Sequence, residues 1–564
     1  MNMRANLRID NARVLDVYSG EIADMPVCVR EGRILGFSRL EADETVDAGG
    51  AFLLPGLIDA HIHLESSMLC PACFAQAVLP RGTVTVIADP HEIANVKGTA
   101  GLAYMLEATR QLPLDVRFML PSCVPALPVE DAGASLSAED LLPWLDSPRV
   151  AGLGEMMNVP GVLNGDAELM AKARAALDRG KKVDGHSPGL SGQSLDAYIA
   201  AGISTDHECS TVEEMQERIR RGMYVLLRES TASRDLLRLL PGVTPANARR
   251  CLFCSDDLHP AEILENGHID HHLRLAVAAG LDPVSAVRMA TLNAAECYGL
   301  IDKGGIAPGR VADMILVDNL RDFRVRAVWA AGRLVAENGR MLEALPPVDD
   351  AAMRGSVRLA PLPAHPFALR IPGGKARVIR LLPRSLITGH HVRTVNVTAD
   401  GFFDCALNPG LVKVAVLERH HATGKIGVGL LDENYGLQGG AIATSVAHDS
   451  HNLVVVGDND DDMRLAVEET ARLGGGVVMA ADSRILAALP LPVAGLMSDR
   501  DAEETADAMR ELLRLARVHF HIREEFDALM ALSFLPLPVI PHLKITARGL
   551  FDVDVFRFVH IAAP

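Results

Sequence analysis

A pair of histidines at the end of an apolar run is the residue pattern in this chain best suited to chemistry. His61 and His63 close the stretch LLPGLIDAHIH, which starts at residue 53 and also carries Asp59. Side chains two residues apart on a strand leave the same face, so both imidazoles can reach one metal ion. An isolated pair of this kind is usually an ordinary surface or core feature. Here the pair follows a buried-looking strand, where active sites gather in parallel α/β folds, and this position favours metal binding.

Further acids and histidines follow other apolar segments in the central part of the chain. We predict eight short strands, at residues 53–59, 82–89, 116–122, 149–155, 181–187, 202–208, 223–230 and 251–257. In a barrel of parallel strands, catalytic groups project from the carboxyl ends of the strands. Several of these ends carry a potential metal ligand or a polar neighbour, and these residues are Asp89, His91, Glu92, Glu155, His186, His207, Asp256 and Asp257. Their recurrence at successive strand ends indicates one shared site.

Four imidazoles and two carboxylates are enough to hold two divalent metal ions. The predicted ligands are His61, His63, Glu155, His186, His207 and Asp256. Glu155 is predicted to bridge the two ions, because it alone reaches the centre from the fourth strand. Asp256 is predicted both to bind one ion and to accept the proton of the water that the ions activate. Asp257 is predicted to cap the helix that follows it.

The polar residues around these ligands are given secondary roles. We interpret His91 and Glu92 as substrate contacts or as residues that orient a loop, and Asp89 as a further substrate contact. In the last part of the chain, His448 and His451 lie near an apolar strand and are interpreted as structural histidines.

The overall composition limits the classes of partner. The chain has 564 residues, of which 49% are hydrophobic and 23% charged, as expected for a globular protein of several domains. Its formal net charge of −17 argues against binding nucleic acid, which needs a basic surface. The first residues lack the apolar core of a signal peptide, and no uncharged span of about 18 residues is present, so we predict a cytoplasmic protein without membrane contact. A small-molecule substrate fits this composition.

Nine cysteines, an odd number, argue against a framework of disulfide bonds. Two pairs have C-x-x-C spacing, Cys70 with Cys73 and Cys251 with Cys254, so a structural zinc site is an alternative. The second pair lies in a strand-like segment, where small buried thiols are ordinary core residues. We therefore predict no zinc site from these cysteines.

The sequence pattern divides the chain into three domains. Residues 1–56 and 304–345 contain short strands with partly alternating apolar residues, which predicts a small β-sandwich domain built from both segments. Residues 57–303 alternate the eight strands with helical patterns, which predicts a (β/α)8 barrel of the TIM type. Residues 350–564 predict a separate C-terminal α/β domain. The predicted fold class is α/β.

These motifs together resemble the amidohydrolase superfamily. The resemblance rests on PGLIDAHIH, on the histidines of the fifth and sixth strands, on the aspartate of the eighth, and on ATLNAAECYGLIDKGGIAPGRVADMILV. More narrowly, HIHLESSM, IADPHEIANV, GLGEMMNVPGV, DGHSPGLSG, STDHECS and CSDDLHP resemble the bacterial adenine deaminase family. The segment GGAIATSVAHDSHNLVVVG resembles the extra C-terminal domain of that family. The resemblance covers nearly the whole chain.

The resemblance implies hydrolysis of adenine to hypoxanthine and ammonia, as a step of purine salvage. It implies a binuclear centre of two divalent ions, with Mn²⁺ as the expected metal and Fe²⁺ or Zn²⁺ as alternatives. A metal-bridging hydroxide is expected to attack C6 of adenine while Asp256 takes its proton, and Glu92 or His91 is expected to donate to a ring nitrogen. We expect adenine as the small-molecule partner and a homo-oligomer, a dimer, as the assembly.

Two other interpretations remain open. The same ligands could serve a related amidohydrolase that acts on a cyclic amide or a different aminoheterocycle, because they support attack on any such carbon. The alternative from another class is a metal-binding scaffold without turnover. The full ligand set and an available base argue against that scaffold.

Overall fold

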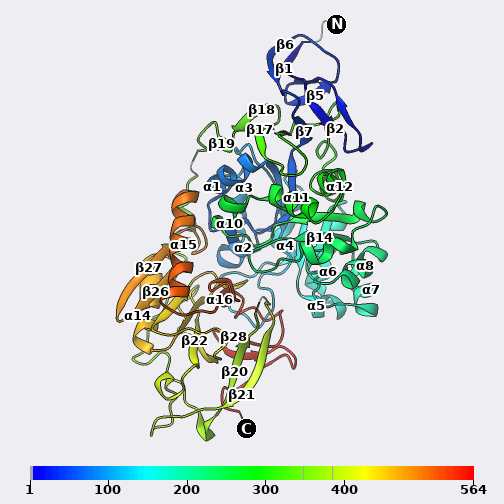
Figure 1. Cartoon of the computed structure of the whole chain (residues 1–564). Helices are drawn as coiled ribbons and strands as arrows, with labels where there is room; N and C mark the ends of the chain where they lie inside the picture. Colours follow the sequence, from blue (N-terminus) through cyan, green and yellow to red (C-terminus); the bar gives the residue numbers. More distant parts are fainter. Residues whose placement is uncertain (1–3, 347, 384, 564) are drawn as a thin grey trace.

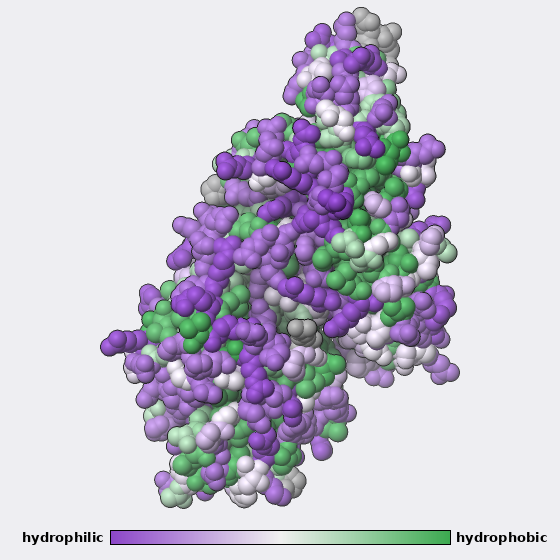
Figure 2. Space-filling view, in the orientation of Figure 1, coloured by the Kyte–Doolittle hydropathy of each residue, from purple (hydrophilic) through white to green (hydrophobic). Residues whose placement is uncertain are grey.

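The computed structural model of the chain describes residues 4–346, 348–383 and 385–563. Figure 1 shows a small β-rich body at the N-terminal end, a central α/β body, and a C-terminal body that carries the other end of the chain. Hydrophilic residues cover much of the face shown in Figure 2, in keeping with the high net charge. None of the helices in the described residues has the length and apolarity needed to cross a membrane.

The β-rich body contains two sheets whose facing sides are apolar. The four-stranded sheet has the order β5 (Arg33–Gly36), β4 (Val27–Arg30), β1 (Ala5–Asp10) and β6 (Ala42–Asp47). The seven-stranded sheet has the order β19 (Arg340–Met341), β18 (Arg333–Glu337), β17 (Val325–Ala330), β16 (Met314–Val317), β7 (Phe52–Pro55), β2 (Arg13–Leu15) and β3 (Ile22–Asp24). Ile9, Leu53, Met314 and Trp329 belong to the buried cluster of this body. The second sheet thus joins strands from both sides of the central body, with β7 antiparallel to β16.

Eight parallel strands form the centre of the molecule. They are β8 (Leu57–Ile62), β9 (Thr83–Ala88), β10 (Asp115–Leu120), β11 (Val150–Met156), β12 (Lys182–Gly185), β13 (Thr205–Asp206), β14 (Tyr224–Arg228) and β15 (Cys251–Cys254). They pair in the orders β12-β11-β10-β9-β8 and β13-β14-β15. Backbone bonds link the two groups on both sides: the Ser204 N–H donates to the Val183 carbonyl at 3.0 Å, and the Asp256 N–H donates to the His61 carbonyl at 3.0 Å. This is the arrangement of a TIM-type α/β fold.

The apolar stretch at residues 53–59 forms two strands instead of the single strand predicted. The chain leaves the sandwich as β7, bends at Gly56 and enters the barrel as β8. A Cβ atom at Gly56 would lie 2.3 Å from Cγ2 of Val84, so the bend requires glycine. Strand β8 extends far enough to include His61, and His63 follows it directly.

Helices alternate with the barrel strands and cover them. These helices are α1 (Pro71–Val78), α2 (His91–Lys97), α3 (Thr99–Ala108), α4 (Ala138–Leu145), α5 (Val159–Leu163), α6 (Ala167–Leu177), α7 (Gly192–Ala200), α8 (Val212–Arg220), α9 (Leu236–Leu239), α10 (Pro260–Asn266), α11 (Ile269–Ala278), α12 (Pro283–Met289) and α13 (Leu292–Cys297). At α8, the Thr211 hydroxyl accepts the Glu214 N–H while the Glu214 carboxylate accepts the Thr211 N–H. This reciprocal cap fixes where the helix begins.

The C-terminal body is built on a mixed sheet of eight strands. Its order is β21 (Thr388–Thr394), β20 (Lys375–Leu381), β23 (Ile426–Leu431), β22 (Val412–Leu417), β25 (Leu453–Gly457), β24 (Ala441–Thr444), β26 (Gly476–Ala481) and β27 (Arg484–Pro490). The remaining elements are α14 (Asp460–Arg472), α15 (Ala502–Val518), α16 (Met530–Ser533), and a small sheet of β28 (Leu543–Thr546), β29 (Gly549–Asp552) and β30 (Arg557–Phe558). Helix α14 packs on the sheet, and α15 also contacts α10 of the barrel.

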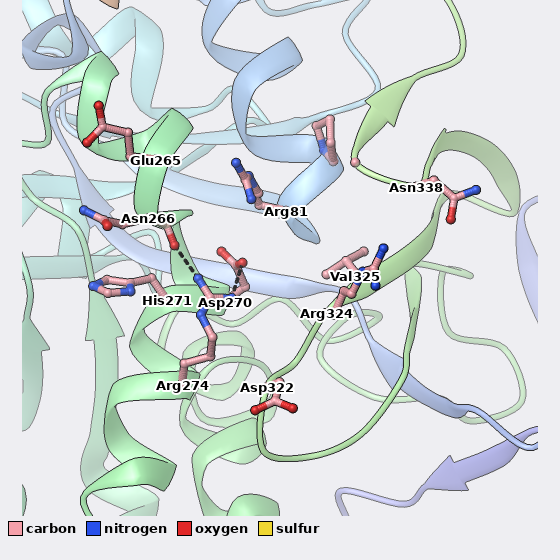
Figure 3. A pocket seen from close by; sticks show the side chains of 12 residues that line it. Arg81, Glu265, Asn266, Asp270, His271, Arg274, Asp322, Arg324, Val325 and Asn338 are labelled. Atoms are coloured by element: carbon pink, nitrogen blue, oxygen red, sulfur yellow. Dashed lines mark hydrogen bonds and ion pairs between the residues drawn. The ribbon is translucent and has the colours of Figure 1, made fainter. Parts of the chain in front are cut away.

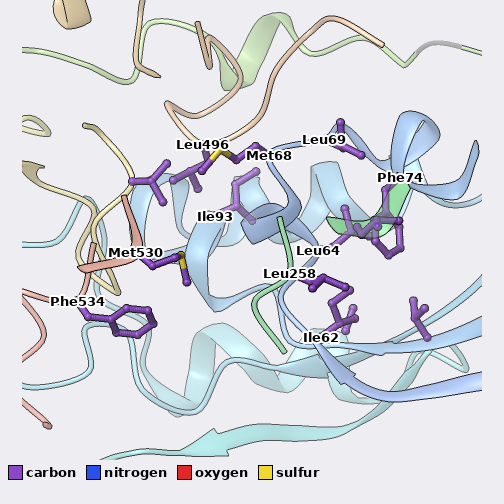
Figure 4. Packing of buried hydrophobic residues seen from close by; sticks show 14 of the residues in the cluster. Ile62, Leu64, Met68, Leu69, Phe74, Ile93, Leu258, Leu496, Met530 and Phe534 are labelled. Atoms are coloured by element: carbon purple, nitrogen blue, oxygen red, sulfur yellow. The ribbon is translucent and has the colours of Figure 1, made fainter. Parts of the chain in front are cut away.

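The C-terminal body packs against the barrel through an apolar cluster. Met68 and Ile93 of the barrel belong to the same buried cluster as Leu496 and Met530 of the C-terminal body (Figure 4). Next to this contact, the Ser498 N–H donates to the Met68 carbonyl at 2.8 Å. Burial of several large apolar side chains on both sides makes this a firm contact. It holds loops of the C-terminal body above the carboxyl ends of the barrel strands.

Candidate metal centre and active site

The six predicted metal ligands meet at the carboxyl ends of the barrel strands. The ligand atoms of one group all lie within 4.8 Å of one another, and this group is His61, His63, Glu155 and Asp256. A second group meets the same criterion and consists of Glu155, His186 and His207. Each of the six residues is at most 8% exposed. The two groups are therefore buried neighbours that share Glu155.

Glu155 lies at the centre because each of its carboxylate oxygens faces a different pair of histidines. Oε1 is 2.7 Å from Nε2 of His63 and 3.3 Å from Nε2 of His61. Oε2 is 2.7 Å from Nδ1 of His186 and 3.4 Å from Nε2 of His207. Burial raises the pKa of Glu155, but the facing histidines outweigh it and hold the pKa well below its usual range. An ionised carboxylate between two ligand pairs is the geometry that bridging requires.

The end of β11 is held in place by Asp89. Its Oδ2 accepts the backbone N–H of Glu155 at 2.9 Å. A Cβ atom at Gly154 would lie only 2.0 Å from this oxygen, so glycine is needed for the strand to approach so closely. Asp89 is not among the described residues that line the cavity beside the ligands, which differs from its predicted substrate contact. Its position favours a supporting role behind Glu155.

Asp59 performs a similar function between β8 and β15. Its Oδ1 accepts the backbone N–H of His61 at 3.2 Å and that of Ser255 at 3.1 Å. Its Oδ2 accepts the Ser255 hydroxyl. One buried carboxylate thus fixes the first and last strands of the barrel relative to each other, next to two of the candidate ligand positions.

Asp256 follows β15 and has a different partner for each carboxylate oxygen. Oδ1 is 3.2 Å from Nε2 of His63, whereas Oδ2 accepts a hydrogen bond from Nη1 of Arg228 at 2.8 Å. The same guanidinium pairs with Glu208. Burial raises the pKa of Asp256, but His61, His63 and Arg228 hold it well below its usual range. Asp256 is therefore ionised and fixed in orientation.

The donor set fits divalent metal ions. Nδ1 of His63 lies 3.0 Å from the Asp89 carbonyl oxygen, which can only accept, so Nδ1 carries the proton. Nε2, the ring nitrogen that is left to bind a metal ion, then faces the carboxylates of Glu155 and Asp256. Burial lowers the pKa of His61, but those carboxylates outweigh it and raise the pKa to about 10. Carboxylates that converge in this way favour positive charge between them, and imidazole with carboxylate suits Zn²⁺, Mn²⁺, Fe²⁺ or Co²⁺.

A cavity of about 30 Å³ adjoins the ligands and has two walls. The barrel wall includes His63, His91, Glu92, Glu155, His186, His207 and Asp256. The other wall comes from the C-terminal body and consists of Leu386, His448, Asp449, Phe534, Leu537 and Ile540. The cavity is therefore polar on the ligand side and largely apolar on the opposite side, as is typical of small-molecule sites.

Two residues predicted to contact substrate begin α2 and do line this cavity, but Glu92 is engaged elsewhere. Its two carboxylate oxygens each accept a hydrogen bond, one from Nδ1 of His448 and the other from Nε2 of His451. Burial raises the pKa of Glu92, but the facing histidines hold it well below its usual range. A carboxylate with both oxygens engaged in this way is not placed to donate, so these contacts do not favour the donor role expected of Glu92. His91 keeps Nδ1 without a hydrogen-bond partner among the described residues.

Asp257 also differs from its prediction. Helix α10 begins at Pro260, and its N-cap residue is His259, whose side chain makes no capping hydrogen bond. Asp257 lies instead on the cavity wall, with Oδ1 buried and unpartnered within the described part of the chain. The proline at the first helical position removes one free N–H and lessens the need for a side-chain cap.

Residues that sequence reasoning missed complete the cavity. His448 and His451 were interpreted as structural, yet both contact Glu92 of the barrel. Arg228 and Glu208 form an ion pair beside Asp256. His448 follows an apolar strand in the same way as the barrel ligands do, but only knowledge of how the C-terminal body docks could have connected it to the site.

Another cavity, of about 500 Å³, lies elsewhere in the described part of the chain (Figure 3). Its charged residues bind one another: Arg274 donates to Asp270 at 2.6 Å and also to the Asn266 carbonyl. Burial lowers the pKa of its histidine, His271, to about 4. Because these polar groups are already paired, we place the chemistry at the smaller cavity beside the buried ligands.

Comparison with known proteins gives matches along the chain. Residues 52–335 match the model of the amidohydrolase family, and residues 385–557 match that of the adenine deaminase C-terminal domain. Adenine deaminase of Nitratidesulfovibrio vulgaris (strain DP4) is 60% identical, with 99% of this chain and 96% of that protein covered. Adenine deaminase 2 of Carboxydothermus hydrogenoformans is 48% identical, with 99% and 97% covered. Adenine deaminase of Clostridium acetobutylicum is 43% identical, with 98% and 97% covered.

Proposed function

This chain belongs to the adenine deaminase family of amidohydrolases, and we propose that it hydrolyses adenine to hypoxanthine and ammonia at the six-ligand centre. We choose this site because of the position of Glu155. Its two oxygens face separate pairs of histidines, and Asp256 lies alongside. We choose adenine as the substrate because the relatives that match over nearly the full length are adenine deaminases.

The proposed centre holds two divalent ions. His61, His63 and Asp256 would hold one ion, His186 and His207 the other, and Glu155 both. Such ions would activate a water for attack at neutral pH. We favour Mn²⁺, with Fe²⁺ or Zn²⁺ as alternatives, and a role in purine salvage by a homodimer.

Asp256 is the proposed proton acceptor. It is ionised, and one of its oxygens faces the ligand histidines while Arg228 holds the other. It would take one proton of the attacking water as the water oxygen bonds to C6 of adenine and the double bond between C6 and N1 becomes a single bond. It would then pass this proton to the amino group, which leaves as ammonia when its bond to C6 breaks, and the second proton of the water ends on N1 of hypoxanthine. Arg228 is a positioning residue that keeps the carboxylate ionised and correctly turned.

The apolar wall contributes binding and shielding. Phe534, Leu537 and Ile540 face the polar ligand side across the cavity. A flat purine ring can pack against such side chains while its amino group points to the ligands. Closing the cavity with these residues also keeps bulk water from the reacting atoms, which strengthens the electrostatic interactions inside.

The experiment that tests this function is ammonia release from adenine, adenosine and cytosine by metal-stripped protein reloaded with Mn²⁺, Fe²⁺ or Zn²⁺. We expect rapid release from adenine alone, and the metal that gives the highest rate would identify the preferred cofactor. If no metal supports release from adenine, the proposed function is wrong. Release from another heterocycle would instead support a related amidohydrolase activity.

A further inference from the structure

His448 belongs to the C-terminal body but lies on the wall of the active-site cavity. Its side chain is buried, with 2% of the residue exposed. Nδ1 donates to Glu92, a residue 356 positions earlier in the chain. Nε2 is buried too, and it has no hydrogen-bond partner among the described residues. The ring thus uses one nitrogen to join the two bodies and leaves the other available.

The ring of His448 is held in a defined orientation. It stacks on Phe534, with ring centroids 4.4 Å apart and planes 11° from parallel. Its own backbone N–H donates to the carbonyl of Ser533 at 2.9 Å. With Glu92 fixing Nδ1, the ring has little freedom to turn, and the direction of Nε2 is set before any ligand binds. Preorganised polar groups of this kind are typical of binding sites.

The neighbouring His451 shows that this cluster is a hydrogen-bond chain and not a third metal site. Nδ1 of His451 accepts the backbone N–H of Ala447 at 3.0 Å, so this nitrogen carries no proton. Nε2 must then carry the proton that it donates to Glu92. A histidine bound to metal donates through its other nitrogen, which His451 cannot do here. Burial lowers the pKa of His451 to about 4, consistent with a neutral ring.

The carboxylates around His448 favour its charged form at neutral pH. Burial lowers its pKa, but the carboxylates of Glu92 and Asp257 outweigh burial and raise the pKa to about 9. Both ring nitrogens are then protonated, and Nε2 is a donor without an acceptor in a buried cavity. A buried donor without an acceptor costs free energy, and a ligand that accepts its hydrogen bond removes this cost.

We infer that His448 binds the substrate directly, its Nε2–H donating a hydrogen bond to a ring nitrogen of the purine. This inference rests on the proposed function, because adenine offers ring nitrogens as acceptors. Attack of water at C6 moves negative charge onto the ring nitrogens, so a fixed cationic donor stabilises the transition state more than the ground state. His448 therefore takes the role that had been expected of Glu92, and the C-terminal body supplies part of the active site.

Two substitutions separate the two nitrogens of His448. In His448→Asn, the amide nitrogen takes the place of Nδ1, so the contact with Glu92 is kept and the cavity donor is lost. In His448→Gln, the amide nitrogen reaches the place of Nε2 and restores a neutral donor. We expect kcat/KM for adenine to fall by about 10²–10³ in the Asn variant, as on loss of a transition-state donor, and to recover partly in the Gln variant.

A matched control lies on the surface of the same body. His542 is also bonded through Nδ1 to a carboxylate, that of Asp554 at 2.7 Å, but its side chain is 47% exposed. His542→Asn should leave both kcat/KM and metal content at wild-type values. The His448 variants should also keep their full metal content, because His448 is not one of the proposed ligands. If the Asn variant loses metal, or if both variants match wild type in kcat/KM, the inference is wrong.

Binding of purine analogues identifies the contact independently of turnover. Dissociation constants of adenine and of 1-, 3- and 7-deazaadenine would be measured for wild type and for His448→Asn. One analogue should bind wild type more weakly and show no further loss in the variant, because both changes remove the same hydrogen bond. Additive losses for all three analogues would overturn the inference. Absence of ammonia release from adenine by wild type would instead refute the proposed function, and the binding series would still decide the role of His448.

Discussion

At Asp256, a single carboxylate is divided between two tasks. One oxygen faces His63 of the ligand group, and the other is held by Arg228. The ion pair with Arg228 prevents the carboxylate from turning and lowers its pKa. The residue is thus able to accept a proton and to pass it on without changing its position, which is the requirement for a general base that later acts as an acid.

We predict that Asp256→Asn removes turnover while leaving most of the metal in place. The amide has nearly the same shape and one oxygen for a metal, but it cannot accept the proton. The expected loss in kcat is about 10²–10⁴-fold, the usual range for general acid–base catalysis. Metal content per chain and kcat with adenine would be measured together. Asp196→Asn is the control, because Asp196 also pairs with an arginine, Arg221, but on the surface.

For single residues, the sequence allowed a prediction where a candidate site residue lies at the end of a predicted strand. Asp256, Glu155 and His186 could be selected because each lies at or next to the end of a predicted barrel strand, and parallel strands bring their ends together. His448 carries the same local signal, but its importance depends on a contact with Glu92 across 356 residues. No local pattern encodes which loop of one domain will rest on another, so this part of the site could not be predicted.

Among the elements, β11 shows how a strand is shaped to deliver a ligand. Asp89 binds the backbone N–H at the end of this strand, and Gly154 leaves room for it. A larger residue at that position would have to displace either the Asp89 carboxylate or the strand. Either displacement would move Glu155, because it is the next residue in the chain.

We therefore predict that Gly154→Ala weakens metal binding and lowers stability. The added methyl group would meet the Asp89 carboxylate at 2.0 Å, and such overpacking costs about 1–3 kcal/mol of unfolding free energy. Metal content after dialysis and the midpoint of denaturant unfolding would measure the two effects. Gly389→Ala serves as the control, since its new methyl group would come no closer than 3.1 Å to the nearest side chain, that of Arg380. Equal metal retention in both variants would contradict the prediction.

The elements themselves were largely accessible from sequence, and the exceptions have local causes. The strand expected at 149–155 is β11, one residue displaced, because its apolar run and flanking loops are unambiguous. The run at 53–59 could not be divided correctly, because the bend at Gly56 depends on the approach of Val84 from another strand. An apolar run in the sequence predicts that its residues are buried, but it does not predict which sheet each of them joins.

For the molecule as a whole, the contact between Glu92 and His448 links the barrel to the C-terminal body. Glu92, Asp257 and Asp449 all face the His448 ring and favour its charged form. The pKa of His448 is raised in the docked state to about 9, above the ordinary value of 6.5. Its contribution to docking is thus fully present below pH 6.5 and is lost as the pH rises through 9.

Hydrogen exchange of the loop that carries His448 should report this pH dependence. After correction for intrinsic exchange rates, we expect opening of the loop at residues 445–452 to become more favourable between pH 7 and pH 9.5. In His448→Asn, which cannot lose a ring proton, this part of the dependence should disappear. The same pH dependence in wild type and variant would show that other groups control the docking.

Metal removal should destabilise the barrel in particular. The proposed ligands come from β8 and the residue after it, from the end of β11, and from the loops after β12, β13 and β15, so bound ions tie these elements together. An ion that binds only the folded state adds about 2.7 kcal/mol when its free concentration is a hundred times the dissociation constant. Calorimetry of chelator-treated protein should show a lower Tm, and readdition of Mn²⁺ should restore it. An unchanged Tm would argue against metal at this centre.

The small volume of the cavity has a consequence for the rate of the reaction. At about 30 Å³ it is only a little larger than the 10–15 Å³ or so that one water molecule needs, and a bicyclic purine requires more space. Some of the lining side chains must therefore move before adenine can enter and before hypoxanthine can leave. We expect this motion in the apolar side chains Leu386, Leu537 and Ile540 of the C-terminal wall, since His448 is held by Glu92 and Phe534. Entry and release then depend on motion of this wall, a step that a viscous medium would slow.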